Sequence, residues 1–336
     1  MTSDAAHARA RVEDFQEKFA RLKNEIAKQI VGYQDVVEKV LIALFSSGHV
    51  LLEGVPGLGK TTLVRALSEA LHVHFSRIQF SPDIMPADIL GTNVLVVGDD
   101  GSKEFRFQRG PIFANVILAD EINRATPKTQ SALLEAMQEH TVTVGGTTYK
   151  MTQPFFVLGT QNPIEMEGTY PLPEAQVDRF FFKLDVGYLG EDELLQVLDR
   201  TTGATAPKVE PVLNAEEILG MRQLVREVVA AEHVRRYVVR VGQSTHPDSD
   251  VATPMVKRFV KYGCSPRGIQ TLMLGGKVKA LVEGRFHLAC EDVRYIAHDA
   301  LRHRTLLNFE GEAAEVRSDA IIDEILASTK ELAATA

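Results

Sequence analysis

The octapeptide GVPGLGKT, Gly54–Thr61, decides the fold of this chain. It matches the phosphate-binding pattern G-x-x-x-x-G-K-[ST], whose glycines let consecutive backbone N–H groups turn toward phosphate oxygens. The apolar run HVLLEG leads into it, and a helical pattern that reaches about Leu71 follows it. A strand, a phosphate loop and a helix in this order predict a nucleotide-binding α/β domain, because phosphates bind at helix N-termini.

The residue types of this loop indicate what it binds. Lys60 places a positive charge near the β and γ phosphates, and the Thr61 hydroxyl can ligand Mg²⁺. ATP and Mg²⁺ are therefore the expected cofactors. We expect the nucleotide to contact Gly54, Val55, Pro56, Gly57, Leu58, Gly59, Lys60, Thr61 and Thr62.

A second motif, VILADEINR (Val116–Arg124), is an apolar run that ends in two adjacent carboxylates. A nucleotide hydrolase requires such a strand after its phosphate loop. Asp120 would hold the magnesium through water, and Glu121 would act as general base or polarise the attacking water. Glu121 could also be a solvated acid that opens the next loop. A small-molecule kinase would need an acid at its acceptor hydroxyl instead, so the pair favours hydrolysis.

Further polar candidates follow downstream. The run FFVLGTQNP ends in Thr160, Gln161 and Asn162, and the Asn162 amide could bind the γ phosphate or the attacking water, although a turn explains Asn-Pro equally well. Arg179 precedes another apolar strand, and Arg267 begins a later helix. An arginine that neutralises transition-state charge accelerates phosphoryl transfer about 10³- to 10⁵-fold. Both arginines are therefore candidates, although a lone arginine is usually half of a surface ion pair.

The order of elements predicts two domains. From Gly48 to Asp185, short apolar runs alternate with helical patterns, which predicts an α/β fold with a doubly wound parallel sheet. After Asp185 the strands stop, and only helical patterns follow, among them NAEEILGMRQLVREVVAAEHVRRYVVRV and PRGIQTLMLGGKVKALVEG. We expect a nucleotide-binding domain over residues 1–186 and a smaller all-α domain over residues 187–336. The pair Gly275-Gly276 is unexpected inside a helix, because each glycine is unfavourable by about 1 kcal/mol relative to alanine.

Two segments of the first domain carry hairpin signals. NVLVVG and KEFRFQ flank the turn Asp99-Asp100-Gly101, and TVTVGGTTYKMT alternates around Gly145-Gly146. Before them, an amphipathic N-terminal helix is predicted by apolar residues at three- and four-residue steps. These residues are Val12, Phe15, Phe19, Leu22, Ile26 and Ile30.

Composition limits the classes of partner and compartment. The net charge of −8 argues against a general nucleic-acid or anionic-membrane surface. Two widely spaced cysteines, Cys264 and Cys290, indicate a reducing compartment, and no histidine pair has a metal-ligand spacing. The N-terminus lacks the apolar core of a signal peptide, and no apolar stretch approaches about 18 residues. We expect a cytoplasmic protein, not inserted in a membrane, with protein partners.

The motifs GVPGLGKT, NVILADEINRA, LGTQNP, PEAQVDRF and CSPRG, in this order and spacing, resemble those of the MoxR family of AAA+ ATPases. The resemblance runs from about Val31 to Arg304. It implies a P-loop AAA+ domain followed by a helical lid, assembled into a homo-oligomeric ring, usually hexameric, with ATP at subunit interfaces. Hydrolysis would make lid and core rotate against each other.

The resemblance also implies roles for single residues. Gly54–Thr61 would be Walker A, Asp120 and Glu121 Walker B, Asn162 sensor 1, Arg267 sensor 2, and Arg179 the arginine finger supplied to a neighbour. Val31 and Gly32 match the start of the adenine-side element. Tyr33 replaces the family's glutamine there, so only the position of the adenine pocket carries over. Arg124 follows the family pattern without an assigned role.

Three classes of function remain after these arguments. The first is an ATP-driven, chaperone-like remodeller of protein clients, for which the resemblance suggests von Willebrand factor A domain proteins. Its hairpins would face the channel of the ring, where Phe105, Phe107 or Tyr149 would transmit motion to the client. The second is a chelatase-type motor subunit for metal insertion into a tetrapyrrole. The third is a nucleic-acid motor, against which the acidic balance counts.

Overall fold

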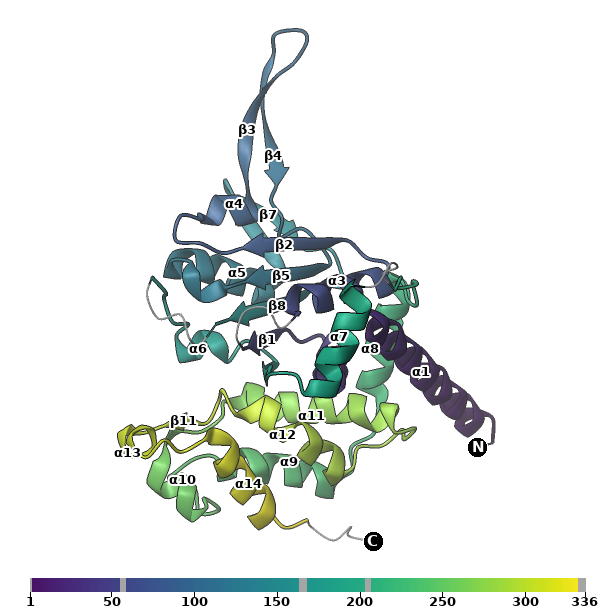
Figure 1. The fold of residues 1–336 in the computed structure, drawn as a ribbon, viewed down its shortest axis with the longest axis vertical. Coiled ribbons are helices and arrows are strands. Elements are labelled where there is room, and N and C mark those ends of the chain that lie inside the picture. Colours follow the sequence, from purple (N-terminus) through teal and green to yellow (C-terminus); the bar gives the residue numbers. More distant parts are fainter. Residues whose placement is uncertain (1, 55–58, 163–167, 203–206, 332–336) are drawn as a thin grey trace.

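The computed structural model describes residues 2–54, 59–162, 168–202 and 207–331. At its centre lies a five-stranded parallel sheet in the order β2-β5-β8-β1-β9 (Figure 1). The predicted doubly wound α/β fold is confirmed. The strands are β1 (Val50–Glu53), β2 (Phe75–Gln79), β5 (Val116–Asp120), β8 (Phe156–Gln161) and β9 (Phe182–Asp185).

Alternate side chains of these strands enter two separate hydrophobic cores, because successive residues of a strand face opposite sides of a sheet. Leu52 and Leu118 lie in the core shared with helices α1 (Thr2–Gln29), α2 (Gln34–Phe45) and α3 (Lys60–Ala70). Leu51 and Ile117 lie in the core that α5 (Pro127–Glu139) covers on the other side. The apolar stripe expected on the N-terminal helix is buried from Val12 to Ile30.

Both predicted hairpins are confirmed. β3 (Gly91–Val97) and β4 (Lys103–Arg109) form a long ribbon that projects from the body of the domain (Figure 1). β6 (Thr141–Val144) and β7 (Thr147–Lys150) pair around Gly145 and Gly146, whose φ angles are 57° and 80°. Two consecutive positive φ values explain the two glycines, because residues with a Cβ rarely adopt them. The short elements α4 (Pro86–Leu90), η1 (Ile122–Arg124) and α6 (Glu174–Val177) complete this domain.

The elements after β9 are helical, as the predicted fold class requires, with one additional feature. The helices are α7 (Glu191–Thr202), α8 (Ala215–Glu227), α9 (Glu232–Ser244), α10 (Pro254–Phe259), α11 (Pro266–Val282), α12 (Cys290–Leu301), α13 (Phe309–Ala313) and α14 (Ser318–Ser328). The additional feature is a small antiparallel sheet of β10 (Val260–Tyr262) and β11 (Leu306–Leu307). Local periodicity could not predict this sheet, because the two strands are brought together by the intervening helices.

One long helical pattern of the sequence is two helices in the structure. α8 ends at Glu227 and α9 begins at Glu232. Between them, the backbone N–H of Val229 donates to the Phe286 carbonyl, and the Val229 carbonyl accepts from the N–H of Leu288. This pairing with a distant segment takes the backbone groups that a continuous helix would have used.

The glycine pair in α11 is explained by close helix packing. A Cβ at Gly275 would lie 2.6 Å from Ile296 Cδ1, and one at Gly276 would lie 2.7 Å from Leu288 Cδ1. Ile296 belongs to α12, so the two helices can approach this closely only where α11 has no side chain. This close contact requires glycine at both positions, although glycine has a lower helix propensity than alanine.

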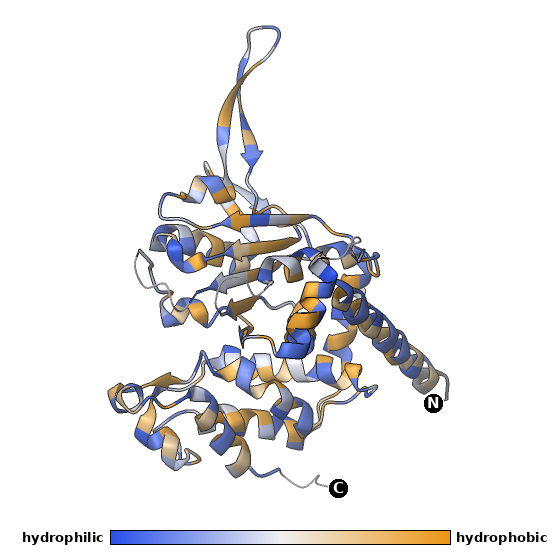
Figure 2. Ribbon diagram, in the orientation of Figure 1, coloured by the Kyte–Doolittle hydropathy of each residue, from blue (hydrophilic) through white to orange (hydrophobic). Residues whose placement is uncertain are grey.

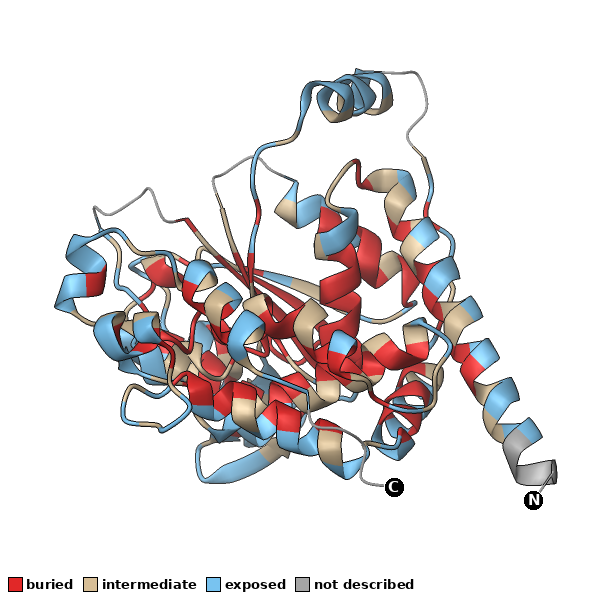
Figure 3. Ribbon diagram, turned by 90° about the horizontal axis from the view of Figure 1, so that it is seen from below, coloured by how far each residue is buried: buried red, intermediate tan, exposed pale blue. Residues whose placement is uncertain are grey.

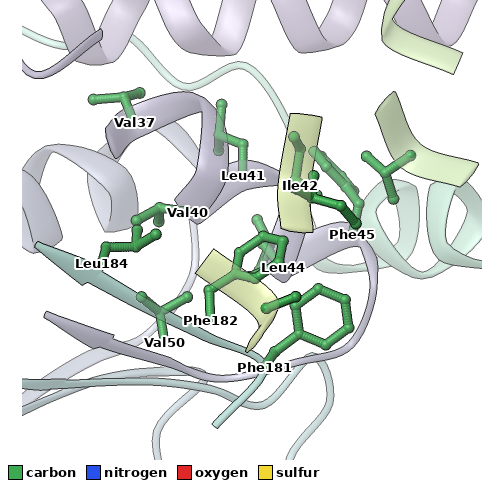
Figure 4. Close-up of a cluster of buried hydrophobic side chains, with 14 of the residues drawn as sticks. Val37, Val40, Leu41, Ile42, Leu44, Phe45, Val50, Phe181, Phe182 and Leu184 are labelled. Carbon is green, nitrogen blue, oxygen red and sulfur yellow. The ribbon is translucent and has the colours of Figure 1, made fainter. Parts of the chain in front are cut away.

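The lid helices and the sheet domain share one continuous hydrophobic core. Its side chains come from α2, β1 and β9, and α11 and α12 pack against the same cluster (Figure 4). Lys39 of α2 forms a buried ion pair of 2.6 Å with Asp299 of α12. Domain and lid are therefore joined within one chain by apolar and charged contacts.

Helix α7 differs from the other long helices because none of its residues is buried (Figure 3). Its apolar face, coloured orange in Figure 2, includes the exposed Leu194, Leu195 and Leu198.

Within the described ranges, we find no helix that combines the length and the apolar character needed to cross a membrane.

Candidate functional site

A cavity of about 380 Å³ opens at the carboxyl edge of the parallel sheet. The segments after β1, β5 and β8 meet there, because parallel strands end on the same side. The cavity is lined by Gly59, Lys60, Thr61, Thr62, Arg77, Asp120, Glu121, Thr160, Gln161 and Asn162. The structure thus brings together residues from all three motifs of the sequence. Val55, Pro56, Gly57 and Leu58, which the sequence also places here, lie outside the described residues.

Lys60 begins helix α3 and reaches across the floor of the cavity. Its Nζ donates to the carbonyl of Gly54 and, at 3.4 Å, to the carbonyl of Gln161. Burial lowers the pKa of Lys60, against the opposite influence of the Asp120, Glu53 and Glu121 carboxylates. The ammonium group therefore sits where backbone carbonyls hold it at the N-terminus of a helix, which also attracts anions.

Gly54 is required for close packing. A Cβ at this position would lie 2.5 Å from the carbonyl oxygen of Val186, the residue that follows β9. Gly59 adopts a φ of 76°, which places it in the left-handed region directly before α3. The first glycine lets the phosphate loop leave the sheet beside β9, and the second lets it enter the helix.

A side chain of β8 holds the Asp120 carboxylate and the backbone of Glu121 at the end of β5. Thr160 Oγ1 donates to Asp120 Oδ1 at 2.7 Å and accepts from the backbone N–H of Glu121 at 2.8 Å. Glu121 has a φ of 57°, an uncommon backbone conformation for a residue with a side chain. Strain of this kind is concentrated at functional sites, where surrounding contacts maintain it.

Strand β2 contributes two residues that sequence analysis missed. Arg77 Nη2 lies 2.6 Å from Asp120 Oδ2, and Gln79 Nε2 donates to Glu121 Oε2 at 2.8 Å. Arg124, which had no expected role, donates from Nη1 to the same Glu121 oxygen at 3.2 Å. The only signal for Arg77 and Gln79 in the sequence was their polar character at positions i and i+2 of HFSRIQF. The sequence did not show that the strand of Asp120 would lie beside them.

The cavity suits a magnesium ion that is coordinated partly by protein side chains and partly by phosphate oxygens. The Thr61 hydroxyl and the Asp120 carboxylate line the same cavity. No cluster of three or more metal-binding His, Cys, Asp or Glu side chains occurs among the described residues. Mg²⁺ usually takes one or two carboxylates together with substrate phosphates and water, and this donor set fits that habit.

The residues expected beside the adenine lie near the start of α7. Val31 is buried, and Gly32 has a φ of 65°. A Cβ at Gly32 would lie 2.7 Å from Leu189 Cδ2, and the Tyr33 hydroxyl donates to the Gly187 carbonyl at 2.8 Å. These residues join the end of α1 to the segment after β9. They are not among the described residues that line the phosphate-side cavity.

Arg179 and Arg267 lie elsewhere, in a second cavity of about 360 Å³. This cavity includes Gly48 and His49, which precede β1, and Phe181, which precedes β9. It therefore opens at the amino edge of the sheet. The two cavities therefore lie at opposite ends of β1, a strand of four residues with a rise of about 3.3 Å per residue. The structure brings the two arginines together but does not bring them to the phosphate loop of their own chain.

Comparisons with known proteins agree with this geometry. Residues 49–182 match the profile of the ATPase family associated with various cellular activities (AAA), and residues 253–325 match that of the AAA lid domain. The chain is 42% identical to Chaperone MoxR1 of Mycobacterium tuberculosis over 302 residues, which cover 90% of this chain and 79% of that protein. It is 31% identical to Protein MoxR of Methylorubrum extorquens, with 93% of this chain and 95% of that protein covered.

Two further relatives extend the likeness. The uncharacterized protein YeaC of Bacillus subtilis is 41% identical to this chain over 95% of this chain and 96% of its own length. A crystal structure of a candidate ATPase from Cytophaga hutchinsonii superposes with a TM-score of 0.90 at 37% identity and covers 99% of both chains. The phosphate loop, the paired carboxylates, the helical lid and these relatives agree. The chain belongs to the MoxR family of AAA+ ATPases.

Proposed function

We propose that this protein hydrolyses Mg²⁺-ATP at sites shared between identical subunits of a ring, and that it uses the cycle to remodel protein clients. One observation carries the shared site. The phosphate-side cavity lies at the carboxyl edge of the sheet, whereas Arg179 and Arg267 lie at the amino edge. Arginines that neutralise the developing charge must reach the γ phosphate, so they must come from a neighbouring copy.

Each residue of the cavity has a task in this proposal. Lys60 binds the phosphates, with Thr61 and Asp120 as ligands of the magnesium. Bound magnesium neutralises phosphate charge. Glu121 accepts the proton of the attacking water, and Asn162 orients that water. In the structure, the Glu121 carboxylate accepts a hydrogen bond from Gln79. In this step it must exchange that bond for one from the attacking water.

The neighbouring copy completes the site. Its Arg179 and Arg267 stabilise the charge that develops on the γ phosphate as the bond to the leaving oxygen breaks. Helix α7 begins shortly after Val186, whose carbonyl lies beside Gly54. The exposed leucines of this helix also favour a contact with another protein chain on this side of the molecule. We propose a hexameric homo-oligomer in the cytoplasm.

The working movement then occurs between copies. Rotation of the lid against its own domain would break their common hydrophobic core and the buried Lys39–Asp299 pair. Loss of the γ phosphate releases the arginine contacts of the neighbouring copy, so whole subunits shift relative to each other. We retain the boundary at residues 186 and 187 as a division of the chain into ATPase domain and lid.

The projecting β3–β4 hairpin is the element that would carry this movement to a client. It stands away from the sheet domain (Figure 1) and exposes Leu95, Val97 and Phe105. Proteins that contain a von Willebrand factor A domain are the clients we propose. The support for this choice is the family membership of the chain.

Mixing two inactive variants tests the shared site. Glu121→Gln lacks the base, and Arg179→Ala lacks the finger. In a random equal mixture, about a quarter of the interfaces pair an intact Glu121 with an intact neighbouring Arg179. ATP hydrolysis should therefore return to about that fraction of the wild-type rate, whereas each variant alone stays inactive.

Two controls accompany the mixture. Arg236→Ala removes an exposed arginine whose ion pair among the described residues is with Glu232 on its own helix, and it should hydrolyse ATP like the wild type. Native mass spectrometry must show that the two inactive variants assemble together. Mixed assemblies without activity would mean that Arg179 acts within its own chain or only in folding.

A further inference from the structure

Arg304, which lies shortly after the lid helix α12, is almost completely buried, with 4% of its surface exposed. Its Nε lies 2.7 Å from Asp178 Oδ1, and its Nη2 donates to the carbonyls of Asp178 and Phe180 at 2.9 and 2.7 Å. Its Nη1 donates to the Phe181 carbonyl at 3.2 Å and to the Ala300 carbonyl at 2.5 Å. All three nitrogens of the guanidinium group are therefore bonded.

Most of these partners flank one residue. Asp178, Phe180 and Phe181 lie on either side of Arg179 in the segment between α6 and β9. Arg304 thus binds the backbone before and after Arg179 and fixes the direction in which that side chain leaves the chain. A lysine could not do the same, because a single ammonium group lacks the planar fork that serves several acceptors at once.

The carboxylate of Asp178 extends this contact to the second arginine. Ser265 Oγ donates to both carboxylate oxygens at 2.9 Å, and Arg267 Nη1 lies 3.5 Å from Oδ2. Ser265 is also the N-cap of α11, because its Oγ accepts from the backbone N–H of Arg267. One carboxylate therefore connects the base of the Arg179 segment to the helix start that carries Arg267.

A contribution to fold stability alone explains the Asp178–Arg304 ion pair poorly. Well-packed apolar side chains usually stabilise a core as well as a buried ion pair does, whereas a pair with many fixed hydrogen bonds defines one geometry. Three segments meet at this pair: residues 178–181, residues 265–267 and the turn that follows α12. Two of these segments carry Arg179 and Arg267, which line the second cavity together with Arg304.

We propose that Asp178 and Arg304 are positioning residues that hold Arg179 and Arg267 as one preassembled unit, which a subunit donates to the ATP site of its neighbour. This inference rests on the proposed function. It adds that the two arginines act together, and that residues without contact to the nucleotide set their geometry. Because lid and domain both contribute to the unit, the docked lid of each subunit keeps it assembled.

The Asp178→Asn variant tests the inference. The amide keeps the size of the side chain and one acceptor oxygen, but it loses the charge that holds Arg304 and Arg267. We expect kcat for ATP hydrolysis to fall about 10²-fold, the effect of a displacement of about 1 Å at a reacting centre. The Kd for ATP should stay at the wild-type value, because the subunit's own phosphate cavity lies at the other edge of the sheet. A purely structural defect would not separate the two.

Mixing experiments then assign the defect to one side of the interface. Lys60→Ala impairs the receiving side, so a mixture of it with Asp178→Asn should regain activity. Arg179→Ala impairs the donating side, so its mixture with Asp178→Asn should stay inactive. A wild-type kcat for Asp178→Asn overturns the inference, and so does recovery of activity with Arg179→Ala.

Ser265→Ala is the milder second variant, which decides the matter if Asp178→Asn does not fold. It removes the hydroxyl that bonds Asp178 and should lower kcat about three- to tenfold with an unchanged Kd for ATP, a loss that corresponds to one hydrogen bond. Its matched control is Thr253→Ala. Thr253 caps α10 through Val256 but has no bond to Asp178, so this variant loses a similar cap and should keep wild-type kcat.

The outcome separates this inference from the proposed function. If Arg179→Ala and Lys60→Ala do not restore each other's activity, the shared site fails. If they do, but Asp178→Asn and Ser265→Ala keep wild-type kcat, only the positioning role fails.

Discussion

The rings of Phe107 and Tyr149 are stacked, with centroids 4.1 Å apart and planes inclined by 19°. Phe107 belongs to β4 and Tyr149 to β7, so this contact joins the two hairpins that sequence analysis predicted separately. Phe113 meets both rings edge-on. By contrast, 72% of the surface of Phe105 is exposed. Of the three aromatic residues proposed to meet a client, Phe105 is exposed, whereas the other two are partly buried and join the hairpins into one unit.

A double-mutant cycle tests this division. Phe107→Leu and Tyr149→Leu should each lower the free energy of unfolding, with a coupling energy of about 0.5–1.5 kcal/mol, the worth of an aromatic pair beyond its buried area. Urea unfolding of the four proteins measures the coupling. Phe105→Leu is the control on the same strand and should change stability by less than about 0.5 kcal/mol. Additive effects of the pair would show that the hairpins are not joined through these rings.

The phosphate-loop lysine and the catalytic carboxylate should give separable defects. Lys60→Ala should bind ATP at least about tenfold more weakly, because a charge-assisted hydrogen bond contributes about 1.5–3 kcal/mol. Glu121→Gln should bind ATP with little change and hydrolyse it hardly at all. Calorimetric binding and phosphate release measure the two properties. If Glu121→Gln hydrolysed ATP at the wild-type rate, Glu121 would lose its assigned role.

Arg77 should compete with magnesium for Asp120. Its guanidinium lies 2.6 Å from the carboxylate oxygen, and about half of its side chain is exposed. A partly exposed pair contributes up to about 1 kcal/mol, which corresponds to about a fivefold change in affinity. We therefore expect Arg77→Met to lower the Mg²⁺ concentration that half-saturates binding of a fluorescent ATP analogue by up to this factor.

The matched control for Arg77 is Arg65→Met. Arg65 pairs with Glu69 on the outer surface of α3 and does not line the cavity. This variant should keep the wild-type magnesium dependence. Weaker magnesium binding in Arg77→Met would show instead that Arg77 supports the bound ion and nucleotide.

Stability should fall in mild acid because of buried histidines. His49 is buried, with 4% of its surface exposed, and its Nδ1 accepts from the N–H of Val157 at 3.0 Å. Burial, together with the charges of His140 and Arg222, lowers the pKa of His49 to about 3. Burial likewise lowers the pKa of His303 well below its usual value. The unfolded chain takes up these protons near pH 6.5, whereas the folded chain does not, so acid favours unfolding.

The expected size of this effect follows from the proton count. Between pH 6.5 and about pH 4.5, each such histidine lowers the free energy of unfolding by up to about 1.4 kcal/mol per pH unit. Above pH 6.5 its contribution is constant. Urea unfolding at several pH values measures the slope, and His49→Gln should remove one histidine's share of it. An unchanged slope in this variant would contradict the assignment to His49.

The glycines of α11 should resist replacement, in contrast to an exposed helical glycine. Gly275→Ala should destabilise the protein, because its Cβ would lie 2.6 Å from Ile296 Cδ1. Adding Ile296→Val removes that methyl group and should recover part of the loss. In α8, a Cβ at Gly220 would meet nothing within 4 Å, so Gly220→Ala should stabilise by up to about 1 kcal/mol. Thermal unfolding compares the three proteins, and stabilisation by Gly275→Ala would refute the packing argument.

Much of the fold could be predicted from local patterns. The five strands of the sheet, both hairpins and the N-terminal helix follow from periodicity and from glycine-containing turns, which act within a few residues. The phosphate loop and the Asp120-Glu121 pair also follow, because chemistry dictates their residue types and their position after a strand. The break between α8 and α9 and the small β10–β11 sheet could not be predicted, because their backbone partners lie far away in the sequence.

By itself, the sequence determined the fold class, the phosphate loop and the identities of Lys60, Asp120, Glu121, Arg179 and Arg267 as candidates. Only the tertiary structure decided which of them share a cavity. It placed Arg77 and Gln79 against the two carboxylates, and it placed Arg179 and Arg267 at the opposite edge of the sheet beside Arg304. The physical reason is that side chains meet through strand order and through lid packing, which arise from contacts between segments distant in sequence and leave no local pattern.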